Sequence, residues 1–478
     1  MSKEKVFVEN ITKRNADFSQ WYTDVALKTE MVDYGPVRGT MVIRPYGYAV
    51  WELIQRQMDD MFKATGHSNV CFPMFIPESL LQKEADHVEG FAPEVAWVTH
   101  GGGEQLAERL AIRPTSETLF CDMYAKWVQS WRDLPMLYNQ WCSVVRWEKT
   151  TRPFLRSLEF LWQEGHTIHA TAEEAIEETE RMLGVYRDFQ EKVLAVPVIS
   201  GRKSEGEKFA GAQATYSIEA MMQDGKALQA GTSHYFGDRF AKAFDIKFLD
   251  KDGVQKYVHE TSWGASTRMI GGVIMVHGDD RGLVLPPKIA PVQVVIIPIA
   301  AHKEGVAEKA GELFETLRRA GLRVRLDDRD TCSAGYKFND WEMKGVPLRV
   351  ELGPKDIELG QLTVVRRDTL EKGVIPATGC EKALEDMLAE IQLSMFTSAK
   401  RHMDSRIRDA HTLDEVISGV EGGFARAMWC GGEACEQNMK KTHGITTRNI
   451  PADQTPVGDT CACCGEKAQT LIYFAKSY

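Results

Sequence analysis

Ten cysteines are spread unevenly along the chain, and five of them lie beyond residue 429. Cys430 and Cys435 form one close pair, and Cys461, Cys463 and Cys464 follow after 25 intervening residues. Two close groups of thiols on separate turns are what tetrahedral Zn²⁺ requires, and the glycines beside them permit the sharp turns. We therefore predict a zinc site whose ligands are Cys430, Cys435, Cys461 and Cys464.

The sequence leaves the details of this cluster open. Cys463 can take the place of Cys464, and the alternatives to a metal site are a group of buried thiols or a redox-active pair. Four thiolates leave no coordination position for a substrate, so the predicted metal is structural. The other five cysteines are isolated and are interpreted as packing residues; they are Cys71, Cys121, Cys142, Cys332 and Cys380.

A second segment combines arginines with a carboxylate. Arg146 and Glu148 follow the β-like run 136–145, and the chain returns through a basic loop into the run 160–166. Such a hairpin can place a guanidinium on a phosphate and a carboxylate on an exocyclic amine. The alternative is a surface hairpin with ion pairs. Neither G-x-x-x-x-G-K-[ST] nor G-x-G-x-x-G between a strand and a helix is present, so a bound nucleotide must depend on side chains of this kind.

Three further segments place polar side chains beside small ones, as close approach of a ligand requires. They are Arg113–Glu117, Gln229–His234 and Ser262–Arg268. Pro114 restricts the preceding arginine to extended backbone, and Ser116 is the predicted N-cap of the helix that follows. Each segment taken alone is also compatible with an ordinary turn or helix start.

The elements that position these residues form an α+β unit over residues 1–287. Helical patterns cover Tyr48–Thr65, Ser116–Trp131 and Ala172–Lys192, and β-like runs cover Val70–Phe75, Met136–Val145, Tyr216–Met222 and Val273–His277. The last of these runs also continues an apolar, helix-like stretch that starts at Arg268. Strands that follow one another through turns favour an antiparallel sheet.

A boundary is predicted at Leu285–Pro291, where three prolines in six positions stop helix and sheet. Beyond it, strands alternate with a helix, which indicates a small α/β unit over residues 288–398. Its predicted strands are Val292–Ile299, Leu322–Asp327, Leu348–Glu351 and Leu362–Arg366, and its helix is Glu304–Ala320. The cysteine-bearing remainder, residues 399–478, is the third unit.

The composition agrees with three domains, since 478 residues at about 150 per domain give that number. Lys and Arg number 58 against 68 Asp and Glu, a net charge of -10, which argues against a protein coated in basic surface for nucleic acid. Residues 288–400, however, carry 17 basic and 18 acidic side chains, and reading a few bases needs no basic coat.

The first residues are polar and lack the apolar core of a signal peptide. The most apolar stretch, Val292–Ala301, has about half of the ~20 residues that a membrane helix needs. We therefore expect a cytoplasmic protein with no membrane partner.

Taken together and in order, these segments resemble the class II aminoacyl-tRNA synthetases, and among them the prolyl enzymes of the archaeal/eukaryotic-like type. Gly66–Pro73 resembles motif 1 with its dimer-interface proline, and Arg113–Glu117 resembles the amino-acid-binding loop. The segments that resemble motif 2, motif 3 and the C-terminal extension are Arg146–Glu148 with Pro153–Arg156, Gly264–Arg268, and the cysteine-rich tail with Phe474–Tyr478. The resemblance covers essentially the whole chain.

The resemblance implies a fold and a reaction. The fold is an antiparallel-sheet catalytic domain (1–287), an α/β anticodon-binding domain (288–398) and a small C-terminal α/β zinc domain (399–478), in a homodimer. The reaction is ATP-dependent activation of L-proline to prolyl-adenylate, with Mg²⁺ accompanying ATP, and transfer to the 3′-OH of the terminal adenosine of tRNA(Pro). It requires charge stabilisation and alignment more than an acid or base.

The resemblance also assigns site residues. Arg146 and Arg268 are the catalytic arginines. The ATP site comprises Arg146, Glu148, Arg156, Ser157, Gln229, Thr232, Ser266 and Arg268, with Gln229 assisting Mg²⁺. The proline pocket comprises Thr115, Glu117, Arg146, Trp162, Glu164, His166, Phe209 and His234. Arg349, Glu351, Lys355 and Asp356 are assigned to the anticodon guanines, and the tail folds back so that the carboxylate of Tyr478 approaches the active site.

Gln229 lies only 72 positions after Ser157, too few for the editing domain that bacterial-type prolyl enzymes insert there. We therefore expect no inserted editing domain, and correction of small-substrate errors by a separate factor is a hypothesis. Three alternatives remain open: a synthetase for threonine or another amino acid, a catalytically inactive RNA-binding regulator, and an ATP-dependent amino-acid ligase that acts on a carrier protein.

Overall fold

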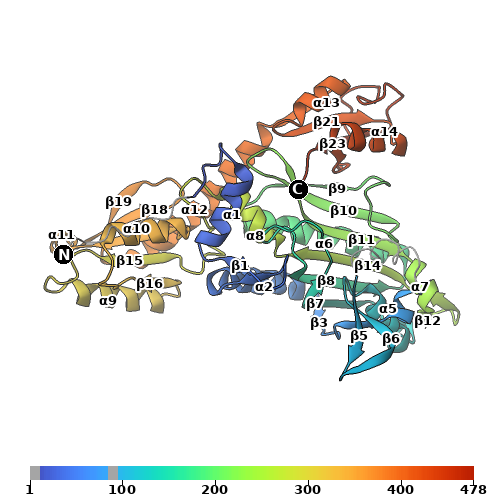
Figure 1. The fold of residues 1–478 in the computed structure, drawn as a ribbon, viewed down its shortest axis with the longest axis horizontal. Helices are drawn as coiled ribbons and strands as arrows, with labels where there is room; N and C mark the ends of the chain where they lie inside the picture. Colours follow the sequence, from blue (N-terminus) through green and yellow to red (C-terminus); the bar gives the residue numbers. More distant parts are fainter. Residues whose placement is uncertain (1–10, 84–94) are drawn as a thin grey trace.

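Seven strands form the central sheet of the computed structural model, which describes residues 11–83 and 95–478 (Figure 1). In order across the sheet they are β3 (Ser68–Asn69), β7 (Met136–Val145), β8 (Glu159–His169), β14 (His259–Ser266), β11 (Ala227–Gly237), β10 (Ala214–Met221) and β9 (Val198–Arg202). Every neighbouring pair is antiparallel except β3 with β7. The predicted antiparallel sheet is confirmed.

The strands β7 and β8 are paired along their whole length, from Met136 opposite Ile168 to Val145 opposite Glu159. Arg146 therefore stands at the strand end, where its backbone N–H donates to the carbonyl of Leu158 at 2.8 Å. The sequence predicts this hairpin correctly, because two β-like runs are separated by a basic loop.

Two helices, α6 (Ala172–Lys192) and α8 (Arg268–His277), pack against one face of this sheet, as Figure 1 shows. The hydroxyl of Ser233 donates to the carbonyl of Thr179 on α6 at 2.7 Å. Since side chains alternate between the faces of a strand, the flanking Thr232 and His234 point to the opposite face, where the cavity described below lies.

Three sequence predictions differ from the structure. Val273–His277 is helical, because α8 is buried nearly all round and an apolar run without periodicity does not distinguish a strand from a buried helix. Of Val70–Phe75, only Phe75 lies in a strand, β4 (Phe75–Pro77), since Pro73 interrupts the run. The helix predicted over Ser116–Trp131 is α5 (Glu117–Trp127), and its continuation is a short 3₁₀ turn, Trp131–Asp133.

The remaining elements of the first unit lie around the sheet. They are α1 (Phe18–Lys28), β1 (Val32–Tyr34), β2 (Met41–Ile43), α2 (Pro45–Ala64), α3 (Glu78–Leu81), β5 (Ala96–Gly101), β6 (Glu104–Ile112), α7 (Arg239–Phe244), β12 (Lys247–Leu249) and β13 (Gln255–Tyr257). The strands β4, β6 and β5 form a separate three-stranded sheet.

The second unit is built on a five-stranded sheet that follows the proline-rich segment. Its order is β16 (Val324–Leu326), β15 (Val294–Pro298), β17 (Leu348–Leu352), β18 (Gln361–Arg366) and β19 (Lys372–Pro376), and its helices are α9 (Val306–Arg319), α10 (Ala334–Met343), α11 (Pro354–Leu359) and α12 (Cys380–Asp404). The helix α12 runs without a break through position 398, where the sequence suggests a boundary, and the next strand begins at Ile407.

The third unit has a four-stranded sheet in the order β20 (Ile407–Ala410), β21 (Phe424–Trp429), β23 (Thr470–Ala475) and β22 (Thr446–Thr447), with the helices α13 (Leu413–Gly419) and α14 (Glu433–Asn438). It lies beside the β9 edge of the central sheet (Figure 1). Among the residues that the structure describes, no helix is both long enough and apolar enough to cross a membrane.

Candidate functional site

A cavity of about 210 Å³ opens on the face of the central sheet away from α6. All eight side chains predicted for the proline pocket line it: Thr115, Glu117, Arg146, Trp162, Glu164, His166, Phe209 and His234. Four further residues predicted for ATP, Gln229, Thr232, Ser266 and Arg268, line the same cavity. The structure therefore brings together segments that are up to about 150 positions apart in the chain.

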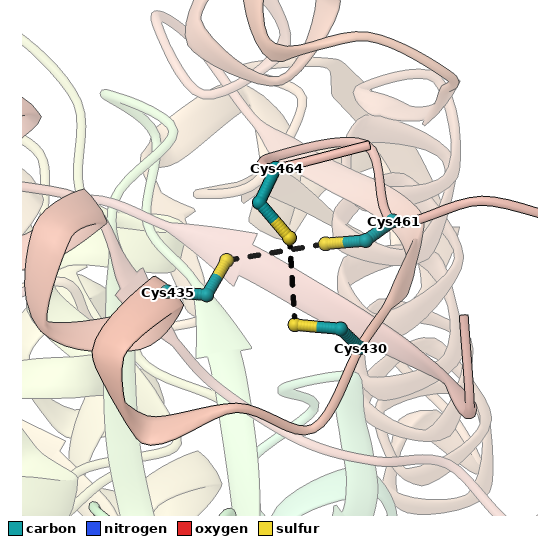
Figure 2. A group of neighbouring side chains, drawn as sticks. All are labelled: Cys430, Cys435, Cys461 and Cys464. Atoms are coloured by element: carbon teal, nitrogen blue, oxygen red, sulfur yellow. Dashed lines mark hydrogen bonds between the residues drawn. The ribbon is translucent and has the colours of Figure 1, made fainter. Parts of the chain in front are cut away.

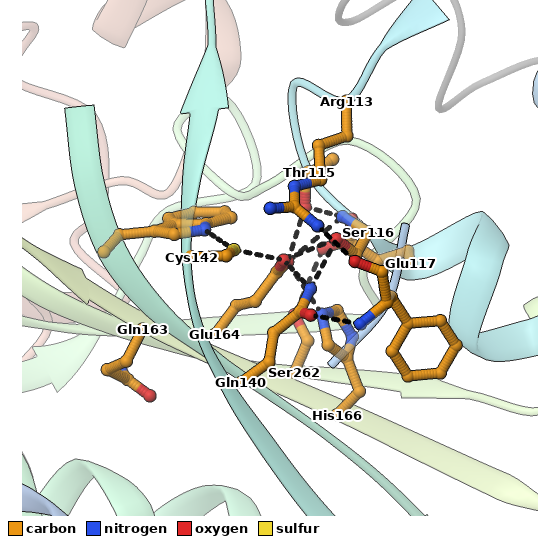
Figure 3. A network of polar contacts seen from close by, with 12 residues as sticks. Arg113, Thr115, Ser116, Glu117, Gln140, Cys142, Gln163, Glu164, His166 and Ser262 are labelled. Carbon is orange, nitrogen blue, oxygen red and sulfur yellow. Dashed lines mark hydrogen bonds and ion pairs between the residues drawn. The ribbon is translucent and has the colours of Figure 1, made fainter. Parts of the chain in front are cut away.

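The carboxylate of Glu164 is the centre of a buried hydrogen-bond network in the cavity wall (Figure 3). It accepts from the hydroxyl of Ser116 at 2.5 Å and its backbone N–H at 3.0 Å, and from the amide of Gln140 at 2.7 Å. His166 Nε2 lies 3.0 Å from Oε2 of the same carboxylate, and Trp162 Nε1 donates to Cys142 Sγ beside it. Glu164 thus fixes the shape of the pocket.

These partners change the ionisation of Glu164 and the interpretation of two neighbours, Ser116 and Gln140. Burial alone raises the pKa of the Glu164 carboxyl, but hydrogen bonds from His166, Ser116 and Gln140 outweigh it and hold that pKa below its usual value. Ser116 is the N-cap of α5, as predicted, but its side chain does not cap the helix and serves Glu164 instead. Sequence reasoning missed Gln140, since a glutamine in a strand carries no distinctive signal.

Glu117 is on the first turn of α5, and its side chain lies beside that of Glu164 on β8. Its carboxylate accepts from the hydroxyl of Thr115, and the hydroxyl of Ser262 lies 3.5 Å away. The two carboxylates and His166 are close enough that one ligand atom of each lies within 4.8 Å of the others. A cationic group that enters this pocket therefore meets two carboxylates in a desolvated wall, where charge interactions are strong.

Two arginines approach the cavity from different elements. The guanidinium of Arg146 lies over the rings of Phe160 and Trp162, at 5.6 and 5.3 Å from their centroids, and its Nε donates to the carbonyl of Pro114 at 3.1 Å. Arg268 begins α8, and its Nε donates to the carbonyl of Leu155 at 3.2 Å. Burial, together with the charge of Arg146, lowers the pKa of Arg268 to about 10, so Arg268 stays cationic at neutral pH.

Three residues predicted for ATP do not line the cavity: Glu148, Arg156 and Ser157. Arg156 Nε lies 3.9 Å from a carboxylate oxygen of Glu148, and both residues belong to the loop of the hairpin. The hydroxyl of Ser157 donates to the carbonyl of Glu159 at 2.7 Å and lies against a separate apolar cavity.

Buried histidines give the fold a pH dependence. Burial lowers the pKa of His169 and His277 to about 4 and that of His234 to about 3, against about 6.5 in an unfolded chain. The unfolded state therefore binds protons first, and stability is complete above about pH 6.5 and decreases as the pH falls towards 4.

We predict that His277→Gln, which keeps a donor for the carbonyl of Leu194, loses about 1–2 kcal/mol less stability than the wild type between pH 7.5 and pH 5. Urea unfolding at the two pH values measures this difference. An identical loss in the two proteins would contradict the assignment to His277.

The four side chains predicted to contact the anticodon differ in their partners and in their exposure. On β17, Arg349 Nη2 lies 3.0 Å from Glu351, which also accepts from Lys372 at 2.7 Å. The carboxylate of Asp356 accepts from the backbone N–H of Gly353 and from Thr363, both at 2.9 Å, and so closes the start of α11. Lys355 on the first turn of α11 is exposed.

Four cysteines converge in the third unit (Figure 2). The sulfur atoms of Cys430, Cys435, Cys461 and Cys464 lie within 4.8 Å of one another, with Cys435–Cys461 at 3.9 Å and Cys464–Cys430 at 3.6 Å. Tetrahedral thiolate ligands at about 2.3 Å from Zn²⁺ are roughly 3.8 Å apart, so the geometry fits this metal. Gly431 and Gly465 supply the turns with φ of 76° and 77°.

Cys463 is not in this group of four. Of the five cysteines interpreted as packing residues, Cys121 and Cys380 are buried, but Cys71 is exposed, so that interpretation is wrong for it. Cys142 lies beside Glu164 in the pocket wall, at 3.5 Å.

The C-terminal tail returns to the first unit. The backbone N–H of Tyr478 donates to the carbonyl of Ala227 at 3.2 Å, and its phenol donates to Asp224 at 2.7 Å. Lys226 lies over its ring at 4.9 Å. The tail therefore lies at the start of β11, and Tyr478 is not among the residues that line the cavity.

Three protein families match successive parts of the chain. The tRNA synthetase class II core domain (G, H, P, S and T) matches residues 97–277, an anticodon binding domain matches residues 293–388, and the prolyl-tRNA synthetase C-terminal domain matches residues 413–478.

Relatives that match the chain over its full length agree with these three family matches. The chain is 60% identical over 478 residues to a proline–tRNA ligase of Alkaliphilus oremlandii, covering 100% of this chain and 99% of the relative. It is 61% identical over 480 residues to a proline–tRNA ligase of Ruminiclostridium cellulolyticum, and 58% identical over 480 residues to proline–tRNA ligase 2 of Bacillus cereus, with complete coverage of both chains in each case.

Proposed function

The chain belongs to the proline–tRNA ligase family of class II aminoacyl-tRNA synthetases, and from this premise we propose how its residues carry out the reaction. The reaction activates L-proline with ATP to prolyl-adenylate and then transfers the prolyl group to the terminal adenosine of tRNA(Pro), on its 3′-OH. The observation that supports the residue roles best is that the proline and phosphate residues surround one cavity.

Proline is a compact secondary ammonium ion with an apolar ring, and the cavity offers a partner for each part. Glu117 and Glu164 receive the ammonium, with Glu164 held ionised by its neighbours. The rings of Trp162 and Phe209 enclose the apolar ring, and Phe209 packs at 4.6 Å on His234. An open-chain amino acid leaves part of this wall without contact, and a hydroxyl group on the side chain lies against apolar rings without a partner there; both differences favour proline.

Activation forms a bond between a carboxylate oxygen of proline and the α-phosphorus of ATP, and the bond to pyrophosphate breaks. Arg146 holds the carboxylate and the α-phosphate together, and its planar guanidinium stabilises the charge on the crowded phosphorus. Arg268 holds the γ-phosphate of a bent ATP, with Thr232 and Ser266 beside it. Gln229 is the residue that would hold the Mg²⁺ of the ATP complex, which supplies further charge neutralisation. Glu148, with Arg156 and Ser157 on the same loop, binds the adenine side of the nucleotide.

The first step gives the test of this proposal. Exchange of labelled pyrophosphate into ATP should require proline and should need no tRNA. Measured with each of the twenty amino acids in turn, exchange with threonine but not proline would contradict the proposal.

We propose the division 1–287, 288–398 and 399–478 for the catalytic, anticodon-binding and C-terminal domains, and a structural Zn²⁺ in the last. In the second, Arg349, Glu351, Lys355 and Asp356 form the surface that reads the anticodon guanines. Since Asp356 also closes α11, the exposed Lys355 is the member whose removal separates recognition from folding.

Lys355→Ala is therefore expected to raise the KM for tRNA about tenfold, for a lost contact of about 1–2 kcal/mol, while proline-dependent exchange is unchanged. Lys382→Ala on the exposed face of α12 is the matched control. Charging kinetics with tRNA as the varied substrate measure the effect. An unchanged KM for tRNA in Lys355→Ala would remove this residue from the recognition surface.

We also propose that the chain forms a homodimer through the region of Pro73. The next two side chains, Met74 and Phe75, are 37% and 47% exposed, which is unusual for large apolar residues in sequence beside each other. Sedimentation of the wild type should give a dimer that Phe75→Asp weakens. A monomeric wild type at micromolar concentration would contradict this assembly.

A further inference from the structure

Three charged side chains, nearly excluded from water, connect the third unit to the cavity. Lys203 is 4% exposed, Glu219 0% and Arg448 6%. The ammonium of Lys203 lies 3.0 Å from one carboxylate oxygen of Glu219, and the guanidinium of Arg448 donates to the other from Nη2 at 2.7 Å and from Nε at 3.2 Å. Lys203 also lines the cavity, whereas Arg448 comes from the C-terminal unit.

The segment that carries Arg448 is fixed against the edge of the central sheet. Ile450 and Arg202 exchange backbone hydrogen bonds of 2.8 and 3.0 Å, so the segment extends the sheet beyond β9. Asn449 donates to the carbonyl of Ile199 at 2.6 Å and accepts from the hydroxyl of Ser217 at 2.7 Å. A Cβ on Gly201 would lie 2.3 Å from the carbonyl oxygen of Ile450, so the contact is as close as the backbone allows.

The position of the triad along the strands relates it to the phosphate residues. On neighbouring strands, Glu219 stands opposite Gln229, and Ser217 stands opposite Thr232. Directly opposed residues of an antiparallel pair point to the same face of the sheet. Glu219 therefore lies under the part of the cavity to which the nucleotide phosphates are assigned, and its negative charge opposes, without reversing, the lowering of the pKa of Arg268.

The charges of the triad do not cancel. Two cations share one carboxylate, which leaves the three groups with one positive charge in excess; the carboxylate of Glu207, which lines the same cavity and also acts on Lys203, is paired with Lys440 at 2.8 Å. Charges in a desolvated wall act over several ångströms with little screening. Burying such a group is costly, and removing one partner strongly affects the other two. Without Arg448, Lys203 and Glu219 are a neutral pair, so the surplus charge of the triad depends on the C-terminal unit.

We propose that Arg448 is a positioning residue for amino-acid activation: it holds Glu219, and through Glu219 it keeps Lys203 and one surplus positive charge against the phosphate chain of ATP. This rests on the proposed function, since it takes Gln229, Thr232 and Arg268 as the phosphate site. It makes the C-terminal unit part of the active site rather than a separate appendage.

The test compares Arg448→Met, which keeps a long apolar stem, with Arg448→Lys, which restores the charge. Arg426→Met is the matched control, because Arg426 lies in the same unit and pairs with Asp409 away from the cavity. Pyrophosphate exchange is measured with ATP and with proline as the varied substrate, and thermal unfolding is measured in parallel.

We expect Arg448→Met to lower kcat/KM for ATP by roughly 10–100-fold, with the KM for proline changed by less than about threefold. Arg448→Lys should recover most of this loss, and Arg426→Met should match the wild type. Lys203→Met provides a second test that leaves the docking of Arg448 on Glu219 intact, and it should reproduce the loss on ATP.

Wild-type ATP kinetics in Lys203→Met would overturn the proposal whether or not Arg448→Met folds. It would also be overturned if Arg448→Met lost activity towards ATP and proline equally, together with thermal stability, and Arg448→Lys did not recover it. A wild type without proline-dependent exchange would be a failure of the proposed function instead, so the two failures are distinguishable.

Discussion

Arg146→Ala is expected to abolish proline-dependent pyrophosphate exchange while the protein stays folded. The guanidinium of Arg146 is the one group proposed to contact both substrates at the reacting atoms, and its contacts with the rings of Phe160 and Trp162 and with the carbonyl of Pro114 hold it in place before they bind. Removing one preorganised charge donor of this kind costs roughly 10²–10³-fold in rate, and losing the alignment of two substrates adds to that.

The control for this variant is Arg187→Ala, which removes an arginine from the exposed side of α6. Both proteins should show wild-type circular dichroism and similar thermal midpoints. Exchange in Arg146→Ala that stays within tenfold of the wild type would refute the role of this arginine in activation.

Cys461→Ser is expected to release the metal and unfold the C-terminal unit. Cys461 is 2% exposed and packs in the core of that unit, so its loss removes a ligand and leaves a hydroxyl in an apolar site. Structural zinc contributes on the order of 10 kcal/mol of folding free energy in small zinc domains. We expect the zinc content to fall from about one per chain to near zero, with an early unfolding transition.

Two cysteine variants serve as controls. Cys463→Ser changes the thiol next to the fourth ligand and should retain zinc, and Cys380→Ser changes a buried thiol far along the chain from the cluster. Elemental analysis of the purified proteins measures the metal directly. Loss of zinc in Cys463→Ser together with retention in a Cys464→Ser variant would reverse the assignment of the fourth ligand.

The catalytic sheet was predictable because its β-like segments follow one another through turns. The hairpin of β7 and β8 and the helix α6 have the predicted bounds or differ by few residues, since each carries a strong pattern over ten residues or more. The helix α8 could not be predicted in this way. It is apolar on every side, so its sequence has no helical periodicity, and its structure depends on burial against several other elements.

The residues of the candidate site also fall into those with a local sequence signal and those without one. Residues within compact motifs, such as Thr115, Arg146 and Arg268, were found because their neighbours in sequence identify them. Gln140, Lys203 and Glu219 carry no local signal, because each acts through a partner that is distant in the chain. Arg448 is the extreme case, since 229 positions separate it from Glu219, and only the docking of the C-terminal unit on β9 brings them together.

The central claim is that the chain charges tRNA with proline, and aminoacylation with a complete tRNA pool tests it most directly. The purified enzyme is given ATP, Mg²⁺ and one labelled amino acid at a time, and the labelled tRNA is isolated and its anticodon determined. We predict that label from proline appears on tRNA with a proline anticodon at the terminal adenosine. The account would be contradicted if the main labelled product came from threonine or any other amino acid than proline. It would also be contradicted if proline supported pyrophosphate exchange but no tRNA became charged.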